Sequence, residues 1–421
     1  MNKYSLLFRI IFFLILFDFL FINFNVGVIN ITVLRLLLFF LFYIFILSFL
    51  AGKKFPIVKP IRLILCFFIF WLLYQVVSLL WISYVGLVYS GIYYLIVFSI
   101  LIFITVVLIN NMENVMNAEK TFIFIAVISI VVALAEFITG KHLPVSRFSD
   151  PTNVFYLSDY RAITGPFYNE NDFSLFLSLL TPFLILKFME RKSLYIKIFY
   201  LVLFLASIII IVINDAKLVL IAIALQIIGV VVIAKINVLR KIIFSIVIFL
   251  TALIVVNAEL ISSFTEAFYE IINGQGPNVV RLNLILNGIL VVKSNLLGVG
   301  TGNYIHHISP DLFLGGIVNP HNWWVELLSE HGIIIFVSYL YMFLWLLKSL
   351  LSIYKEKTKI SNIAFAVFLS LFGFIISSGA PSSLYFFWPM WLMIGVALAV
   401  INVSYLNKSS NSRSISKVQH K

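Results

Sequence analysis

The segment from Val318 to Gly332, Val-Asn-Pro-His-Asn-Trp-Trp-Val-Glu-Leu-Leu-Ser-Glu-His-Gly, places a histidine at the start of a strongly apolar stretch. Asn319 is suited to cap a helix and Pro320 to open it, so His321 is expected in the first helical turn. The positive end of the helix dipole disfavours an imidazolium ion there. We therefore predict that His321 is neutral and acts as a general base.

Polar residues continue along the same predicted helix. Asn322, Glu326 and Glu330 follow at intervals of four, which places them on one face. Carboxylates that face lipid are costly, so this face is expected to point into the protein or a wet cavity. His331 lies deeper in the helix and is expected to matter less than His321. The alternative is that this segment only anchors the helix at the membrane interface, with its two tryptophans in the aromatic belt.

Three basic residues are candidates for binding an anionic group near this base. Arg161 and Arg281 lie in two long polar segments, and a guanidinium can hold a diphosphate through two parallel hydrogen bonds. Lys217 is the third candidate, although a local ion pair with Asp215 explains it equally well. The turn Gly298-Val-Gly-Thr-Gly302 lacks the Lys-Ser/Thr of a phosphate-binding loop. We expect it to bring Arg281 close to the histidine.

Two asparagines precede another apolar run and are candidates for binding sugar hydroxyls. Asn169 and Asn171 are suited to that role, but capping of the helix that follows would explain Asn171 or Asp172 equally well. No metal site is expected, because the single cysteine, Cys66, lies in an apolar run and no Asp-x-Asp motif occurs. The pair Glu170-x-Asp172 is the one exception kept open.

Membrane-spanning helices must position these residues. Of 421 residues, 62% are hydrophobic and 11% are charged, and apolar runs long enough to span a bilayer recur along the chain. In lipid the backbone must satisfy its own hydrogen bonds, so these runs are helical despite their β-branched residues. We predict an all-α integral membrane protein with about twelve transmembrane helices, near residues 4–24, 29–50, 61–82, 91–109, 121–138, 173–189, 194–213, 217–234, 242–262, 323–349, 362–379 and 386–405.

The charges orient this map. With a cytoplasmic N-terminus, most of the 29 basic residues fall on the cytoplasmic side, as the positive-inside rule requires. The net charge of +12 is therefore attributed to topology and not to nucleic-acid binding. Two long outer loops separate three blocks of helices, and a cytoplasmic tail follows. These parts are helices 1–138, loop 139–172, helices 173–262, loop 263–322, helices 323–405 and tail 406–421.

The order of these pieces resembles the O-antigen ligase and polysaccharide polymerase superfamily, often called the Wzy/WaaL type. That pattern has an outer Arg, a Gly-Phe-x-Asn-x-Asn-like helix entry, a later basic residue, an outer loop with Arg and Gly-x-Gly, and a His-Asn helix start with Glu and Gly. The corresponding residues, within about 160–340, are Arg161, Gly165-Pro-Phe-Tyr-Asn-Glu-Asn171, Lys217, Arg281, Gly298-Val-Gly300, His321-Asn322, Glu330 and Gly332. Two positions depart from the pattern: Ala216-Lys217 replaces Ser-Arg, and Glu170 replaces Pro.

The resemblance implies a GT-C-like, inverting and metal-independent glycosyltransferase that needs no cofactor and takes its glycan from a polyprenyl diphosphate. His321 would deprotonate the acceptor hydroxyl. The expected substrate-binding residues are Arg161, Asn169, Asn171, Lys217, Arg281, Asn322 and Glu330. The enzyme would lie in the bacterial cytoplasmic membrane among its lipids, with the site on the outer face. A flippase and a chain-length regulator would be its partners.

Other functions stay open at this point. A polymerase joins lipid-linked repeat units to one another, whereas a ligase transfers the glycan to a lipid or protein, and we favour the polymerase. A transporter or lipid-glycan flippase should concentrate charges and broken helices at mid-membrane. Only Asp18 and Arg35 look deep, and they are able to pair with each other. A further class of membrane glycosyltransferases has an acidic pair in its first outer loop, and here residues 25–30 contain none.

Overall fold

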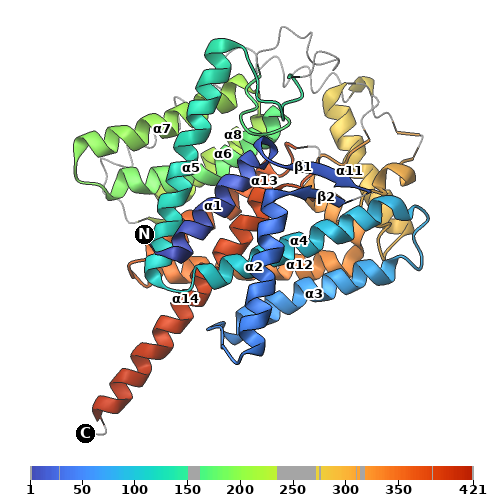
Figure 1. Ribbon diagram of the computed structural model, residues 1–421. Helices are drawn as coiled ribbons and strands as arrows, with labels where there is room; N and C mark the ends of the chain where they lie inside the picture. Colours follow the sequence, from blue (N-terminus) through green and yellow to red (C-terminus); the bar gives the residue numbers. More distant parts are fainter. Residues whose placement is uncertain are drawn as a thin grey trace.

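The protein is described by a computed structural model over most of its length. The described residues are 2–27, 29–149, 162–234, 272–274, 276–309, 311–312, 318–381 and 383–419. They form a helical bundle with a single two-stranded sheet (Figure 1). The expected all-α membrane class is confirmed at this level.

The described helices and strands fall into an N-terminal part and a remainder. The N-terminal part contains α1 (Lys3–Phe17), the 3-10 helix η1 (Asp18–Leu20), β1 (Asn23–Val26), β2 (Ile29–Thr32), α2 (Val33–Leu50), α3 (Lys59–Ser78), α4 (Val85–Leu108) and α5 (Met112–Thr139). The remainder contains α6 (Glu170–Glu190), α7 (Leu194–Ile213), α8 (Lys217–Ile233), α11 (Pro277–Ser294), the 3-10 helix η2 (Tyr304–His307), α12 (Trp323–Lys355), α13 (Ser361–Ser377) and α14 (Trp388–Gln419).

Eight of the described helices are long and apolar enough to cross a membrane: α2, α3, α4, α5, α6, α7, α12 and the first part of α14. They coincide with eight of the predicted spans. The predicted spans 217–234 and 362–379 correspond to α8 and α13, which are apolar but have 17 residues each. The predicted span 242–262 lies outside the described residues. A total of twelve spans therefore stays a prediction.

The first predicted span, 4–24, is too long. Helix α1 ends at Phe17, and the chain then forms the antiparallel hairpin of β1 and β2 before α2 begins. The Asp18 carboxylate accepts a hydrogen bond from Leu34 N at 3.0 Å, near the start of α2. The Arg35 guanidinium donates to the Asn30 carbonyl at 2.6 Å and to the Tyr94 hydroxyl at 2.9 Å. Both deep charges thus stabilise the hairpin and its junction with α2.

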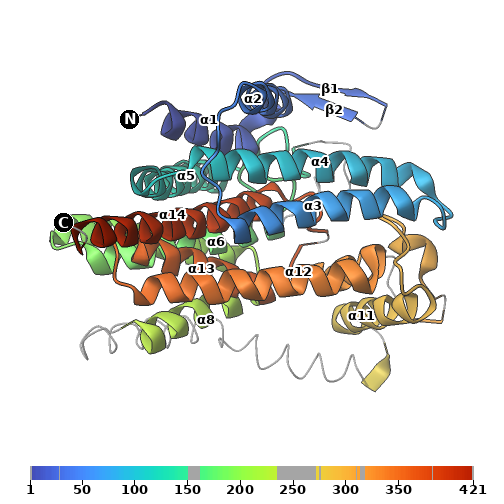
Figure 2. The same cartoon turned by 90° about the horizontal axis from the view of Figure 1, so that it is seen from below.

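Helices α13 and α14 form the centre of the bundle. Helix α14 packs against α4, α12 and α13, and α13 also packs against α6 and α8. Of the apolar window of α14, 89% is buried, compared with 22% for α2. Figure 2 shows this order as layers, with α1, α2 and the hairpin at one edge and α8 and α11 at the opposite edge. These two central helices therefore fix the positions of the helices that pack against them.

A buried side-chain amide supplies the hydrogen bond that a proline removes from α6. Pro182 has no N–H, so the carbonyl of Ser178 lacks its normal helical partner. Gln226 of α8 donates to that carbonyl at 3.0 Å and accepts from the Thr181 hydroxyl at 3.0 Å. Gly373 of α13 leaves room for this amide, since a Cβ there would lie 2.3 Å from its nitrogen. The proline is thereby accommodated inside a helix that has no access to water.

The first prediction concerns topology. In both cartoon views the two termini lie toward one end of the bundle, whereas α11 and the hairpin lie toward the other (Figures 1 and 2). Reporter fusions after Lys54 and Lys408 are expected to report the cytoplasm, and a fusion after Gly276 the opposite side. A cytoplasmic signal from the Gly276 fusion would contradict the map, because α11 would then lie on the wrong face.

Candidate active site

The start of α12 differs from the sequence expectation by a few residues. The N-cap is Asn322, whose side-chain oxygen accepts from Trp324 N at 3.0 Å and Val325 N at 3.2 Å. His321 therefore precedes the helix and does not sit in its first turn, with a left-handed φ of 48°. The predicted cap at Asn319 was wrong because the asparagine three residues later offers the same capping chemistry directly before the apolar run. The Asn322 side-chain oxygen is occupied by the cap.

His321 is half-buried, and its surroundings favour the neutral imidazole. Burial is the largest cause that lowers its pKa, and the positive charge of Arg281 lowers it further. A hydrogen bond to the backbone carbonyl of Ala380 acts in the opposite direction, and it engages one ring nitrogen as a donor. The other ring nitrogen would then be free to accept a proton. The predicted proximity of Arg281 and His321 is therefore supported by their electrostatic interaction.

The N-terminus of α8 meets the same region. The Trp323 amide donates to the Ser378 carbonyl at 3.3 Å, which holds the start of α12 against the end of α13. A Cβ on Gly379 would lie 3.0 Å from the Leu218 side chain and 3.9 Å from the Asn322 amide nitrogen. Leu218 follows Lys217 directly, so the predicted basic residue starts a helix next to the His321 segment. The ends of α8, α12 and α13 converge there.

Lys217 itself forms the local pair that the sequence left open. Its ammonium lies 3.6 Å from the Asp215 carboxylate, and the two side chains are 48% and 68% exposed. An exposed pair of this kind contributes little stability and exchanges easily for another partner. Lys217 is therefore available to an anionic substrate from an exposed position.

Glu326 and Glu330 face the protein interior, as their spacing predicted, but they hold loops in place. Glu326 accepts hydrogen bonds from the Ser383 hydroxyl and from Leu384 N, the latter at 3.0 Å. The Glu330 carboxylate faces the backbone amides of Gly302 and Tyr304. Each carboxylate thus anchors one segment that packs against α12. The contacts of Glu330 support a positioning role, which differs from the substrate contact expected from the sequence.

The glycine turn docks onto a break in α12. Gly332 has φ 76° and ψ 173°, which interrupts the helix. Ile333 N donates to the Leu296 carbonyl at 3.0 Å, and the Ser329 carbonyl, its partner in a regular helix, accepts from Val299 N at 3.0 Å. The turn's backbone thus replaces the hydrogen bonds that the break removes. This docking brings α11, and with it Arg281, beside the start of α12, as the turn was expected to do.

Two glycines make this close approach possible. A Cβ on Gly298 would lie 2.5 Å from the Glu330 carbonyl oxygen and 2.5 Å from Gly332 N. A Cβ on Gly332 would lie 2.4 Å from the Leu297 carbonyl carbon. No side chain fits at either position without separating the two backbones. The Gly-x-Gly turn therefore allows close packing of the turn's backbone against α12.

His331 is a buried structural residue, a role that the sequence analysis did not assign to it. Its Nδ1 accepts from the Trp71 indole at 3.1 Å and lies 3.2 Å from the Gln75 amide nitrogen. Gln75 also donates to the Thr301 hydroxyl at 2.8 Å, and the His331 ring stacks on Tyr385 with centroids 5.4 Å apart. This network ties α3, the glycine turn and α12 together. Sequence spacing alone could not identify partners from a helix some 260 residues away.

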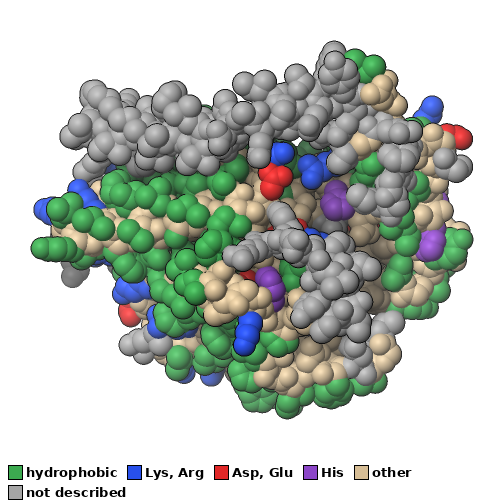
Figure 3. Space-filling model, turned by 90° about the horizontal axis from the view of Figure 1, so that it is seen from above, with side chains coloured by type: hydrophobic (Ala, Val, Ile, Leu, Met, Phe, Trp, Pro, Cys, Tyr) green, Lys and Arg blue, Asp and Glu red, His purple; other side chains and the backbone are tan. Residues whose placement is uncertain are grey.

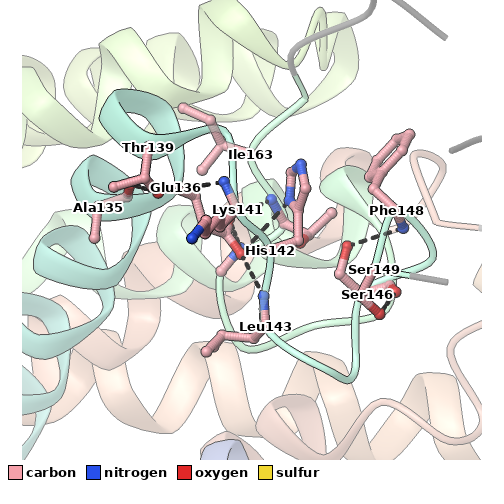
Figure 4. Close-up of polar contacts among 12 residues, drawn as sticks. Ala135, Glu136, Thr139, Lys141, His142, Leu143, Ser146, Phe148, Ser149 and Ile163 are labelled. Atoms are coloured by element: carbon pink, nitrogen blue, oxygen red, sulfur yellow. Dashed lines mark hydrogen bonds and ion pairs between the residues drawn. The ribbon is translucent and has the colours of Figure 1, made fainter. Parts of the chain in front are cut away.

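The other predicted entry, before α6, is held by two buried polar side chains. Glu136 at the end of α5 accepts from Thr164 N at 3.0 Å and Gly165 N at 2.8 Å. It also accepts from Leu143 N at 3.3 Å, so one carboxylate holds the segment after α5 and the segment before α6 together (Figure 4). Asn214 pairs with both backbone groups of Ile163 at 2.8 Å. These contacts place residues 162–169 beside the start of α8.

The structure assigns different roles to the residues predicted for the segment that leads into α6. Asn169 is the N-cap of α6 and accepts from Asp172 N at 2.8 Å, so capping explains it. Asn171 is half-buried and has no side-chain hydrogen bond to another described residue. Arg161 lies outside the described residues, and its role stays a prediction. Of this group, Asn171 is the one whose side chain is left for a substrate.

Arg147 is a cation of the site region that the sequence analysis did not single out. It pairs with the Glu170 carboxylate and lies over the Phe148 ring, and its backbone N–H donates to the Tyr168 carbonyl at 2.9 Å. Arg147 therefore ties the 140–149 loop to the entry of α6. A basic residue on the outer side, where the positive-inside rule makes such residues scarce, was the available signal.

One face of the molecule is drawn in Figure 3. Basic, acidic and histidine side chains lie around a hollow near the middle of this face, and hydrophobic side chains cover much of the remaining surface that is described. Among the described residues, no group of three or more His, Cys, Asp and Glu side chains has the arrangement of a metal site. The arrangement offers an imidazole whose lowered pKa favours the neutral form, the Arg281 guanidinium that influences it, and Lys217 at the start of a neighbouring helix. Such groups are suited to transfer from an anionic leaving group.

Comparisons with known proteins identify the same part of the chain. Residues 177–340 match a family model described as O-antigen ligase. This range contains Lys217, Arg281, His321 and Glu330. The teichuronic acid biosynthesis protein TuaE of Bacillus subtilis (strain 168) is 28% identical over 359 residues, which cover 81% of this chain and 72% of that protein. The resemblance drawn from the order of the sequence motifs is confirmed by these two matches.

The second prediction tests the docking of the glycine turn. Gly298→Ala is expected to destabilise the protein in detergent by about 1–3 kcal/mol beyond the backbone strain, because its Cβ meets backbone atoms of α12. Gly140→Ala is the matched control, since Gly140 also has a positive φ but no atom lies within 4 Å of the position that its Cβ would take. Thermal unfolding of both variants gives the comparison. Equal loss of stability in the two would refute the close-packing argument.

The third prediction tests the electrostatic link to His321. Removing the Arg281 charge raises the His321 pKa toward its ordinary value of about 6.5, because a neighbouring cation disfavours imidazolium. The acid limb of kcat/KM is therefore expected to move to higher pH in Arg281→Gln. Arg281→Lys keeps the charge, so its limb should stay near the wild-type position while the rate falls through loss of the bidentate contact.

Lys293→Gln is the control for this profile, because it removes a charge from the last turn of the same helix. Its acid limb should coincide with that of the wild type. An unchanged limb in Arg281→Gln would show that His321 is not the titrating base or that Arg281 does not influence it.

Proposed function

We propose that this member of the O-antigen ligase and polysaccharide polymerase superfamily is an inverting, metal-independent glycosyltransferase that joins polyprenyl-diphosphate-linked oligosaccharide units into a surface polysaccharide. The observation that carries the proposal is the neutral His321 imidazole, held by the Ala380 carbonyl and influenced by Arg281. A base and a diphosphate-binding cation are the two groups this reaction requires.

The proposed reaction is a direct displacement at the anomeric carbon. The acceptor hydroxyl oxygen forms the new bond to that carbon while the bond to the diphosphate oxygen breaks. The hydroxyl proton passes to the free nitrogen of His321, and the diphosphate leaves with the bonding electron pair. Attack from the side opposite the leaving group inverts the configuration, through a state with oxocarbenium character.

Arg281 would serve this reaction in two ways. Burial is the main cause that lowers the His321 pKa, and the Arg281 charge lowers it further, which favours the unprotonated imidazole that would accept the proton. The same charge would stabilise the negative charge that develops on the departing diphosphate. Arg161 and the exposed Lys217 are proposed as further cations for this group, and Asn171 as a contact to the sugar. Asn169, Asn322 and Glu330 would act indirectly, through the backbone segments that they fix.

Polymerisation is the candidate that we favour, and the similarity to a protein named for teichuronic acid biosynthesis is compatible with it. The second candidate, transfer of the finished glycan to a lipid or protein acceptor, is favoured by the description of the matching family model as O-antigen ligase. Both use the same donor chemistry and the same base. We place the site at the outer face of the bacterial cytoplasmic membrane, where a flippase would deliver the donor and a chain-length regulator would act on the product.

A transporter is disfavoured by the nature of the break in α12. Transporters use interrupted helices to expose backbone groups to ions and substrates. Here the carbonyls of Ser329 and Glu330 accept hydrogen bonds from Val299 N and Gly300 N, at 3.0 and 2.8 Å. The break is thus occupied by the protein's own turn and leaves these two carbonyls no place for an ion.

The fourth prediction tests the base. His321→Ala is expected to reduce the conversion of purified lipid-linked repeat units into longer glycans by about 100- to 10,000-fold. His306→Ala is the matched control, because His306 is an exposed histidine in η2 at the same end of the protein, stacked on Tyr84. Its activity should stay near that of the wild type. Both variants should insert into the membrane normally, since neither changes a spanning segment.

The assay is run with and without a chelator, and activity is expected to survive chelation. Activity retained by His321→Ala together with activity lost on chelation would overturn both the base and the metal-independent mechanism. Glu170 and Asp172 would then become the candidates for metal binding.

A further inference from the structure

A separate groove lies between α2 and α3, away from the His321 site. Its volume is about 610 Å³, and it lies at the connection between the two helices. This connection is fixed to the middle of α14, because the Asn402 side chain accepts from Val58 N and donates to the Pro56 carbonyl, both at 2.9 Å. The groove is therefore at the end of the bundle where the chain termini lie.

One wall of the groove is a single face of α2. Phe42, Phe45, Ile46 and Phe49 line it, at the spacing of residues that share a helical face. Phe103 of α4 forms the floor, with its ring centroid 5.8 Å from that of Phe42 and 6.1 Å from that of Phe45. The wall and floor are apolar surfaces, aromatic except for Ile46, whose lining side chains carry no polar group.

The opposite wall is a matching face of α3. Arg62, Leu65, Cys66 and Ile69 line it with the same spacing. Helices α2 and α3 each pack against α4 but make little contact with each other, so the groove between them is open to the bilayer. Seven residues of helix span about 10 Å. The groove therefore reaches about two thirds of the way through one leaflet's hydrocarbon, which is about 15 Å thick.

Two cations line the groove at its end toward the water. Lys54 and Arg62 both belong to its lining, and both are exposed. Among the described residues, no carboxylate lies within ion-pair distance of either. The turn before Lys54 is itself held by backbone hydrogen bonds, including Lys53 N to the Ser48 carbonyl at 3.0 Å. The apolar groove thus ends at two positive charges, Lys54 and Arg62.

We propose that this groove binds one anionic diacyl phospholipid from the leaflet on the side of the termini. An acyl chain would fill the space between the two aromatic and aliphatic walls. The headgroup phosphate would lie between Lys54 and Arg62, the latter through its guanidinium fork. A zwitterionic lipid carries a compensating cation and gains less from these charges.

Binding would also complete the packing of α2. Only 22% of the apolar window of α2 is buried, the smallest share among the spanning helices that the structure describes. A lipid in the groove contacts both α2 and α3 and replaces the missing contacts between them. The lipid is thus a structural ligand, and its binding does not depend on the glycan chemistry at the other end of the molecule.

Native mass spectrometry of the full chain, titrated with phosphatidylglycerol or phosphatidylcholine, tests this proposal. The wild type is expected to retain one phosphatidylglycerol with clear preference. Lys54→Gln with Arg62→Gln should weaken that binding by about 30-fold, which corresponds to about 1 kcal/mol for each charge. Lys53→Gln with Lys59→Gln is the matched control, since both belong to the same segment but do not line the groove.

A second pair of variants tests the apolar part. Cys66→Trp fills the groove and should remove binding, whereas Leu63→Trp places the same bulk on another face of α3 and should preserve it. Equal losses in the two charge pairs would overturn the proposal in favour of general surface attraction. Equal retention of phosphatidylcholine, or stronger retention of polyprenyl phosphate than of phosphatidylglycerol, would also overturn it.

Discussion

The end of the bundle that carries the candidate site depends on the backbone contact between the 296–300 turn and the break in α12 at Gly332. Inside a membrane a broken helix leaves carbonyl and amide groups that water cannot satisfy. Here the turn supplies the missing partners, because Val299, Gly300 and Leu296 bond to α12 on either side of the break. The contact fixes α11 next to the start of α12. Without it, Arg281 would have no defined position relative to His321.

Polar side chains distribute this constraint through the bundle. Glu330 and the Gln75–His331 pair contact the turn, and Glu326 accepts a hydrogen bond from the loop that precedes α14. Glu136 performs the same task for the loop before α6. Apart from His331 Nε2, which has no hydrogen-bond partner among the described residues, these buried groups bond to backbone amides or other side chains and so hold the loops on which the site is built. The proposed reacting groups, His321 and Arg281, lie closer to the surface.

Sequence reasoning succeeded where one physical rule dominates. Bilayer length and apolar content located eight spanning helices, and charge with spacing placed His321 and Arg281 in one region. It failed where the outcome depends on distant partners. Asn169 caps α6, where Asn171 or Asp172 was also a candidate, and Asn322 caps α12, where Asn319 was expected. The role of His331 depends on α3, and no local pattern reveals it.

The most direct test of the account is a structure of the full chain with a polyprenyl-diphosphate-linked sugar bound. The account predicts that the diphosphate oxygens lie about 3 Å from the Arg281 guanidinium nitrogens. It also predicts that the anomeric carbon faces the His321 ring nitrogen that does not contact Ala380, with room between them for an acceptor hydroxyl. A diphosphate bound at the end of the chain termini, or with the sugar turned away from His321, would contradict the account.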